Sequence, residues 1–325
     1  MTVDDGRFTE LTSDTILPVF PRSISDVSVE AAESICRGLR ERYFRLCVHV
    51  RLPNYSATQV PSGSGQVREV PLGDVFGGVS ATDVRNGVPE NPLMFLLCHK
   101  LAHQLGERGF KQIRFITQNV QSAMRLQTFM AHQRPKVDMV RFSEFQFNDN
   151  RISVLGMNPP ADKDKDSRTN SKETRKAILE DQQHFGISSE DEIVIVVAPS
   201  TEQRATTHML SALENLAGAA TSRKKPIVFL NPELVRRTRF GAGTPYLLAG
   251  FQTVFFIDPC AWRRDSSCSC GLLRRWPGQW EVFFHDVRCA DKGYVFFGTC
   301  FNQPSADWFG VKLKEFNIFA GGSPR

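Results

Sequence analysis

The sequence lacks the features that carry a chain into or across a membrane. No stretch reaches the roughly 18 consecutive apolar residues that a membrane-spanning helix needs. The first residues, MTVDDGRFTELTSD, are acidic and have neither the basic and apolar regions of a secretory signal nor the Arg-rich, acid-poor composition of a transit sequence. We therefore expect a soluble globular protein that either stays where it is made or is a processed form of a longer chain.

Motifs for common kinds of chemistry are also missing. The chain contains neither G-x-x-x-x-G-K-(S/T) nor G-x-G-x-x-G, the loops that cradle phosphates, and it has no G-x-S-x-G nucleophile elbow. His99 and His103 have the spacing of two metal ligands on a helix, but Lys100 stands where a zinc protease places its general base. The sequence names no reaction, and we expect neither a cofactor nor a metal.

The cysteines show no pairing pattern. Most of the 8 lie inside apolar stretches, as Cys36 and Cys47 do, where a free thiol behaves as a small hydrophobic group. This distribution indicates a reducing compartment. Cys260, Cys268 and Cys270 form a local cluster without a C-x-x-C pair, which leaves open a redox-sensitive loop and, less favoured, a zinc site.

Charge of neither sign dominates the chain as a whole. Lys and Arg number 40 against 35 Asp and Glu, so the net charge of +5 is too small for a dedicated nucleic-acid protein. The arginines nevertheless gather in the carboxyl-terminal third with tryptophans beside them, a composition typical of interface hot spots. A solvated basic face is the alternative. We take as candidates for docking a protein partner Arg236, Arg237, Arg239, Arg274, Arg275, Trp276 and Trp280.

Short Val/Ile/Phe-rich runs alternate with helical patterns. The runs IVIVV and IVFL are continuously apolar, as strands are when helices cover both faces of their sheet. The patterns predict strands at residues 44–53, 112–117, 137–142, 151–157, 192–199, 226–232, 253–258, 280–286 and 294–299. They predict helices from Ser28, up to Gly109, after Thr117 and after Pro199.

This order predicts an α/β fold, a three-layer α/β/α Rossmann-like sandwich whose sheet is mostly parallel. After Gly250 the helices end and strands continue, so we expect an antiparallel C-terminal extension of the same sheet. Residues 158–176 are almost free of apolar side chains and are expected to form a mobile charged loop. The predicted organisation is a flexible arm over residues 1–15 followed by a single α/β domain over residues 16–325.

Ligands in a parallel sheet bind beyond the carboxyl ends of its strands. The polar residues predicted there, our candidates for a ligand crevice, are Asn54, Thr117, Ser200, Thr201 and Asn231. Ser200 or Thr201 also fits an ordinary helix N-cap. Asn231, followed by Pro232, fits a turn whose side chain bonds to the neighbouring strand exit.

The order of several motifs resembles one known family. IVIVVAP, KPIVFLNPEL, LLAGFQTVFFI and GLLRRWPGQWEVF follow one another as in the plastid and cyanobacterial family called domain of unknown function nineteen-ninety-five. The early LPVFPRSISDVSVEAAESI and RLCVHVRLP resemble its opening helix and first strand. The family element R-x-(Y/F)-P-G-x-W looks like Arg274, Trp276, Pro277, Gly278 and Trp280, with Trp276 in place of the Tyr or Phe.

The resemblance implies a function that composition alone does not. The family includes a low photosystem II accumulation assembly factor, so the chain is expected to be a non-enzymatic accessory protein of the chloroplast stroma or thylakoid surface. Its implied partner is a photosystem subunit or assembly factor, with peripheral membrane association allowed. The alternative is a protein or enzyme that binds a small phosphometabolite at the strand-exit crevice.

Overall fold

The described part of the chain covers most of the predicted elements. The computed structural model describes residues 17–51, 92–118, 120–132, 139–141, 144–147, 150–157, 187–200, 206–234, 236–238, 241–243, 246–263, 268–286, 294–305 and 307–312. The predicted N-terminal arm and the charged loop at 158–176 lie outside these residues. So do three candidate residues, Asn54, Thr201 and Arg239.

The elements follow the predicted alternation. The helices are α1 (Ile24–Arg40), α3 (Pro92–Glu107), α4 (Val120–His132), α6 (Thr206–Ser222) and α7 (Tyr246–Ala249), and residues 307–312 form a further short helix. The strands are β1 (Arg45–Val50), β2 (Gln112–Thr117), β3 (Met139–Arg141), β4 (Glu144–Phe147), β5 (Asn150–Gly156), β6 (Ile193–Val197), β7 (Ile227–Leu230), β8 (Arg236–Thr238), β9 (Gly241–Gly243), β10 (Gln252–Arg263), β11 (Cys268–Arg275), β12 (Trp280–Asp286) and β13 (Tyr294–Cys300).

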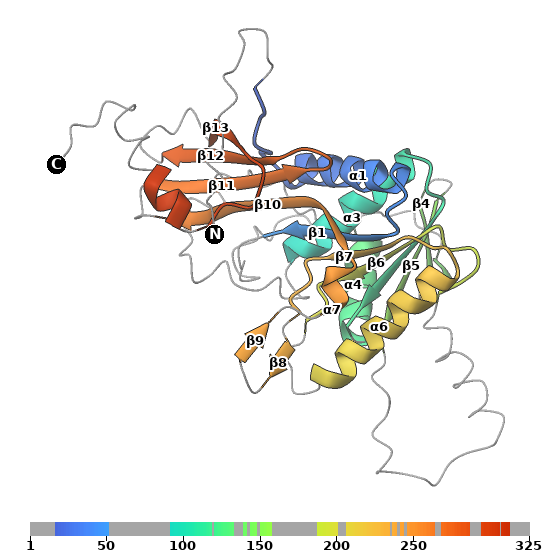
Figure 1. Ribbon diagram of the computed structural model, residues 1–325. Coiled ribbons are helices and arrows are strands. Elements are labelled where there is room, and N and C mark those ends of the chain that lie inside the picture. Colours follow the sequence, from blue (N-terminus) through green and yellow to red (C-terminus); the bar gives the residue numbers. More distant parts are fainter. Residues whose placement is uncertain are drawn as a thin grey trace.

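One sheet of 11 strands organises the fold, in the order β13-β12-β11-β10-β1-β7-β6-β2-β5-β4-β3 (Figure 1). The central strands from β10 to β5 are parallel, and β10 to β13 form an antiparallel series. The predicted α/β class, the parallel strands and the antiparallel C-terminal part are thus confirmed. Strands β3 and β4 add a second antiparallel part at the other end, which the sequence did not indicate.

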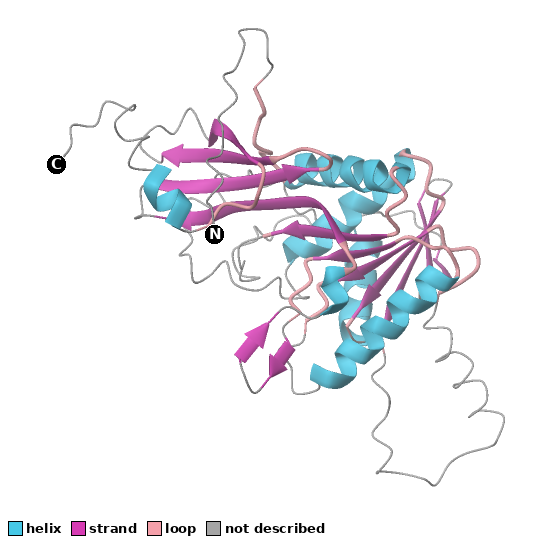
Figure 2. Cartoon of the chain, in the orientation of Figure 1, coloured by secondary structure: helices cyan, strands magenta, loops and turns pink. Residues whose placement is uncertain are grey.

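Helices pack on both faces of the parallel strands (Figure 2). One core joins apolar residues of α1, α3 and α4 to alternate strand residues such as Val48 and Ile195. The other core joins α6 and α7 to the intervening residues, such as Cys47 and Val196. Every residue of β6 and β7 is buried, which explains their uninterrupted apolar sequences. Within the described residues, no helix is both long and apolar enough to cross a bilayer.

Helix α1 begins at a capping box and lies against the C-terminal strands. The Ser23 hydroxyl accepts a hydrogen bond from the Asp26 backbone at 3.1 Å, and an Asp26 carboxylate oxygen accepts one from the Ser23 backbone at 3.0 Å. The helix buries Val27, Ala31 and Ile35 on one face. These residues share a core with apolar side chains of β10, β11 and β12, so α1 covers the junction between the parallel and antiparallel parts.

Strand β11 requires glycine at one position for packing. Phe20, just before α1, stacks on Tyr294 of β13 with 4.2 Å between ring centres and meets Phe283 of β12 edge to face at 5.0 Å. Both Phe20 and Tyr294 lie over Gly271, where an added Cβ would come within 2.9 Å of each ring. The N-terminal segment therefore reaches the sheet only because residue 271 has no side chain.

This packing predicts opposite effects for two glycine substitutions. Gly271→Ala should lower the free energy of unfolding by about 1–3 kcal/mol, since it overpacks a filled core. Gly218→Ala in α6 should raise it by about 0.5–1 kcal/mol, because alanine favours the helix and a Cβ at Gly218 meets nothing within 4 Å. Urea unfolding followed by circular dichroism measures both. Equal stability of the two variants would contradict this description of β11.

Candidate functional site

The carboxyl ends of the parallel strands contain two places where the chain leaves neighbouring strands toward opposite faces. The described helices that follow β1 and β2 are α3 and α4, which pack on one face. Those that follow β6 and β7 are α6 and α7, which pack on the other face. The helices that follow the neighbouring strands β1 and β7 therefore lie on opposite faces of the sheet, and so do those that follow β2 and β6. These are the places where sheets of this kind bind ligands.

Asn231 closes the space between β1 and β7. Its side-chain amide donates to the Val50 carbonyl at 2.5 Å, and its side-chain oxygen accepts a hydrogen bond from the Val50 amide. Its own backbone amide donates to the Val48 carbonyl at 2.8 Å. The residue has a left-handed backbone with φ of 51°, which asparagine tolerates better than most residues. The predicted bond from Asn231 to the neighbouring strand exit is confirmed.

Gln118 spans the space between β2 and β6. Its side-chain amide donates to the Ser200 carbonyl at 3.1 Å, and the side chain is only 4% exposed. The Thr117 hydroxyl donates to the Leu155 carbonyl of β5 at 3.4 Å. In this region too, a polar side chain at a strand exit bonds to the backbone of an adjacent strand or loop.

The exits of β6 and β7 share an unusual path. Ala198 has a left-handed backbone with φ of 43°, at the position after β6 that Asn231 occupies after β7. A proline follows each, and Ser200 then forms a parallel bridge with Glu233. Ser200 thus pairs with a loop residue, and residues 201–205, where Ser200 or Thr201 would cap a helix, lie outside the described part of the chain, so the N-cap stays a prediction.

The structure thus brings Thr117, Ser200 and Asn231 to one edge of the sheet, as the sequence predicts. The Asn231 side chain and the Thr117 hydroxyl bond to backbone groups of neighbouring strands. The Ser200 carbonyl accepts a hydrogen bond from the Gln118 side chain. An extended sheet edge needs such bonds, since buried backbone groups without partners are costly. The described part of this edge is built for closing the sheet.

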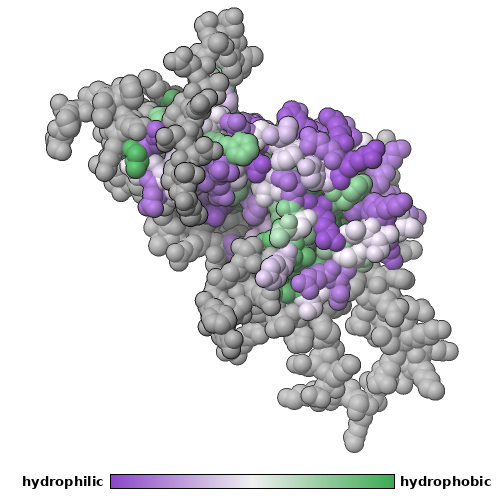
Figure 3. Space-filling view, in the orientation of Figure 1, coloured by the Kyte–Doolittle hydropathy of each residue, from purple (hydrophilic) through white to green (hydrophobic). Residues whose placement is uncertain are grey.

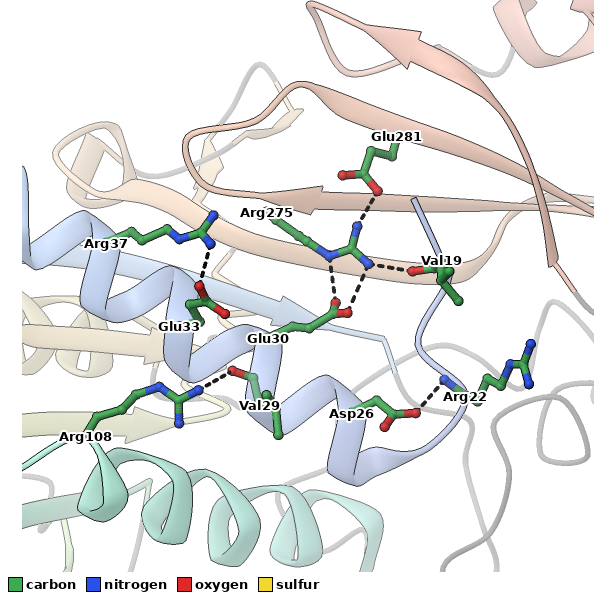
Figure 4. Close-up of polar contacts among 10 residues, drawn as sticks. All are labelled: Val19, Arg22, Asp26, Val29, Glu30, Glu33, Arg37, Arg108, Arg275 and Glu281. Carbon is green, nitrogen blue, oxygen red and sulfur yellow. Dashed lines mark hydrogen bonds and ion pairs between the residues drawn. The ribbon is translucent and has the colours of Figure 1, made fainter. Parts of the chain in front are cut away.

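The docking candidate Arg275 makes an internal ion-pair network (Figure 4). Its guanidinium meets the Glu30 carboxylate of α1 through two parallel hydrogen bonds, Nε to Oε2 at 2.9 Å and Nη2 to Oε1 at 3.0 Å. It also pairs with Glu281 of β12 and donates to the Val19 carbonyl at 2.6 Å. Arg275 therefore joins the C-terminal strands to α1 and to the segment before it, and its side chain is not free to dock a partner.

Burial governs the charges of this network. Desolvation raises the pKa of Glu30 and of Glu281 above the ordinary value, although Arg275 opposes the rise. Burial also disfavours the charged Arg275, but its two carboxylate partners more than offset this and raise its pKa. The contribution of each glutamate to stability therefore falls as the pH rises through its raised folded-state pKa.

The two tryptophan candidates of the hairpin formed by β11 and β12 also pack against other parts of the protein. Trp280 is only 6% exposed and meets Phe256 edge to face, with 5.1 Å between ring centres. The Trp276 indole donates to a Glu41 carboxylate oxygen at the end of α1, at 2.8 Å. The Arg274 guanidinium lies over both indole rings, 5.4 Å from the centre of Trp276 and 5.3 Å from that of Trp280. Of the two arginines in this hairpin, Arg275 forms ion pairs with described carboxylates and Arg274 forms none.

The other two described docking candidates lie in a separate small sheet. Arg236 and Arg237 belong to β8, which pairs only with β9 in a hairpin outside the main sheet (Figure 1). The sequence placed these arginines on the surface between two elements. The hairpin itself was not predicted, because its strands are 3 residues each and β9 contains two glycines.

The described residues offer little for metal or thiol chemistry. They contain no group of three or more His, Cys, Asp or Glu side chains placed to hold a metal ion. His103 pairs with Glu107 of the same helix, Nδ1 to Oε1 at 3.3 Å. Burial raises the pKa of Cys98 and raises that of Cys47 to about 12, so these thiols stay protonated. Burial, with Arg51 nearby, lowers the pKa of His49 to about 4, which keeps it neutral.

Comparison with known proteins identifies the family. The family model described as Domain of unknown function (DUF1995) matches residues 21–309, and the chain therefore belongs to this family. The resemblance seen in the sequence is confirmed. No curated protein matches the chain.

The closure between β1 and β7 predicts a stability difference between two substitutions at one position. Asn231→Gly removes both side-chain hydrogen bonds but keeps the left-handed backbone without strain, and should cost about 1–3 kcal/mol of unfolding free energy. Asn231→Ala removes the same bonds and adds the cost of a left-handed alanine, about 1 kcal/mol more. Urea unfolding of both variants measures the cost of losing the hydrogen bonds and the added cost of a left-handed alanine. Native-like stability of Asn231→Ala would show that the side chain does not hold the two exits together.

The ion-pair network predicts a pH-dependent defect. Arg275→Met leaves two buried carboxylates without their cation and should cost about 3–5 kcal/mol at pH 7. The glutamates then bind protons in the folded state even more tightly, so the loss should shrink as the pH falls from 7 toward 5. Urea unfolding at both pH values measures the change.

The control for this prediction is Arg37→Met. Arg37 forms an exposed pair with Glu33, with 44% and 47% of the two side chains exposed. Such a pair contributes at most about 1 kcal/mol, so the control should change little at either pH. A defect of Arg275→Met that is the same at pH 5 and pH 7 would rule out the buried carboxylates as its cause.

Proposed function

We propose that this member of the DUF1995 family is a non-enzymatic plastid accessory protein that assists photosystem assembly or biogenesis by docking a protein partner. Its three-layer Rossmann-like sandwich acts as a scaffold. The family membership and the geometry of the strand exits support this proposal. The partner is a photosystem subunit or another assembly factor, and association with the thylakoid membrane is peripheral.

One observation carries the proposal. At both places where neighbouring strand exits diverge, the protein's own amide side chains, Asn231 and Gln118, span the exits. Catalytic and nucleotide-binding sheets use these positions for donors and loops that face a ligand. Here the same positions contribute to the cohesion of the sheet, which favours a scaffold over an enzyme.

The surface best placed for docking is the basic hairpin, which we define as residues 236–243. Its described strands, β8 and β9, form a sheet of their own beside the carboxyl edge of the main sheet, and the sequence RRTRFGAG contains three arginines (Figure 1). Tyr246, three residues after it in the chain, is 83% exposed. Arginine and tyrosine are the residue types most enriched where protein partners bind.

A protein partner fits this surface better than a lipid bilayer does. The sequence RRTRFGAG of the hairpin contains three arginines, and on the face drawn in Figure 3 the described residues elsewhere are mainly hydrophilic, with small groups of hydrophobic ones. Insertion into a membrane requires a broad apolar face, as on an amphipathic interfacial helix. Charged and aromatic contacts to a protein require only a few well-placed side chains.

The alternative is a small-molecule binding protein or enzyme at the strand exits. One observation favours it, namely the left-handed Ala198 directly after β6. A non-glycine residue in this conformation stores strain, which accumulates at ligand sites. Its neighbours would bind a phosphometabolite, and the same purified chain would then retain that compound.

Charge reversal of the basic hairpin tests the docking proposal. Arg236→Glu with Arg237→Glu should reduce co-sedimentation of the chain with isolated thylakoids, and recovery of photosystem proteins, at least about tenfold, because like charges across an interface are strongly unfavourable. Circular dichroism checks that the fold survives. Quantitative mass spectrometry of the captured proteins provides the measurement.

The matched control reverses two exposed cations elsewhere, Lys111→Glu and Arg125→Glu. It makes the same change in net charge ahead of β2 and on α4, and should leave both readouts unchanged. An equal loss of association in the control would show that the effect comes from the net charge of the chain and not from the hairpin. Undiminished association of the hairpin variant would refute docking through residues 236–243.

A further inference from the structure

Two adjacent arginines of β11 have opposite surroundings. Arg275 faces α1 and is neutralised by two carboxylates. Arg274, one residue earlier, lies on the other face of the strand, since successive side chains alternate. Its direct partners in the register are Phe256 of β10 and Trp280 of β12.

Two indole rings hold the Arg274 guanidinium in place, but no described carboxylate neutralises its charge. Its guanidinium lies over Trp276 and Trp280, whose electron-rich faces attract a cation. Its Nε atom is buried and has no hydrogen-bond partner. No carboxylate in the described part of the chain forms an ion pair with it, and burial lowers its pKa, the opposite of the direction seen for Arg275.

Such an arrangement is unfavourable in a free protein. A buried N–H without a partner loses its hydrogen bond to water and gains nothing in return. A methionine or leucine would fill the same space between the two indoles without that cost. Retention of a guanidinium here indicates an acceptor that arrives from outside the described protein, since each unsatisfied buried group calls for such an explanation.

An exposed aromatic residue contacts one of the two rings over which this guanidinium lies, and a second exposed aromatic residue follows it in the chain. Tyr43 meets Trp276 edge to face, with 5.5 Å between ring centres, and is 39% exposed. Phe44 beside it is 45% exposed. The nearby Glu41 carboxylate accepts the Trp276 indole N–H. We call Tyr43, Phe44, Arg274 and Trp276 the Arg274 surface, because it combines one uncompensated cation with apolar rings.

We propose that the Arg274 surface binds an acidic peptide segment of a protein partner, in which a carboxylate meets the Arg274 guanidinium and an adjacent apolar side chain packs on Tyr43 and Phe44. The carboxylate oxygens complete the hydrogen bonding of the guanidinium, and arginine with aromatic neighbours is a frequent anchor of protein interfaces. This inference rests on the proposed docking function and adds the chemistry of the segment that the partner presents.

Selection of displayed peptides on the purified full chain tests the proposal. A library of random twelve-residue peptides, which contains no phosphate, is selected on the native protein, and the affinities of the recovered peptides are measured by quenching of tryptophan fluorescence. We expect the recovered peptides to share an Asp or Glu next to an apolar residue. Arg274→Met should weaken their binding at least tenfold, and Arg274→Lys should weaken it less.

The thermal stability of Arg274→Met distinguishes a ligand-binding role of Arg274 from a structural one. If Arg274 serves a ligand, Arg274→Met should match or exceed the native protein in thermal stability, while the control Arg125→Met should retain full peptide binding. Failure to select acidic peptides, or equal binding by Arg274→Met, would overturn the proposal. A marked fall in the melting temperature of Arg274→Met would also overturn it, because the arginine would then serve the fold.

Inorganic phosphate in the fluorescence titration separates two kinds of acceptor. At matched ionic strength, displacement of the peptide by phosphate but not by acetate would overturn a carboxylate ligand in favour of a phosphoryl group. These outcomes do not depend on residues 236–243, so the Arg274 surface and the basic hairpin can fail independently.

Discussion

The ion pairs of Arg275 hold two parts of the molecule in one structure. The antiparallel strands β10 to β13 extend the parallel sheet, and α1 packs across the junction. At that junction, one guanidinium from β11 bonds to Glu30 of α1, Glu281 of β12 and the backbone of Val19. Loss of Arg275 would leave Glu30 and Glu281 largely buried without their cation, which is far more costly than the pair itself is favourable. The hairpin after β11 is thereby fixed, and so is the position of Arg274 and the two tryptophans around it.

The carboxyl edge of the parallel strands is stabilised by side-chain amides at two exits and by an ion pair between Arg51, directly after β1, and Asp258 of β10 at 3.1 Å. Asn231 ties the exit of β7 to β1, and Gln118 ties that of β2 to the loop after β6. Amide side chains suit this task because each can both donate and accept a hydrogen bond, as backbone groups require. In the described part of the chain, the amide side chains at this edge bond to the protein itself, and we propose the basic hairpin and the Arg274 surface as the places where a partner binds.

The sequence predicted the elements that local patterns determine. The buried strands β6 and β7 and the helices around them follow from apolar period, and the role of Asn231 follows from an Asn-Pro pair after a buried strand. Strand β11 was missed, because CSCGLLRR combines a glycine with two arginines and does not alternate like a half-buried strand. Without that strand, the opposite faces of Arg274 and Arg275 could not be seen. The partner of Arg275, Glu30, lies 245 residues away, and no local pattern joins two such positions.

We propose that the chain works by docking proteins and not by holding a small molecule at its strand exits. Native mass spectrometry of the full chain, purified under mild conditions from the cells that produce it, tests this most directly. We expect the mass of the chain alone or with bound proteins. A small molecule present in one copy per chain, released on denaturation and lost in a variant at Asn231 or Gln118 that keeps its fold, would contradict it.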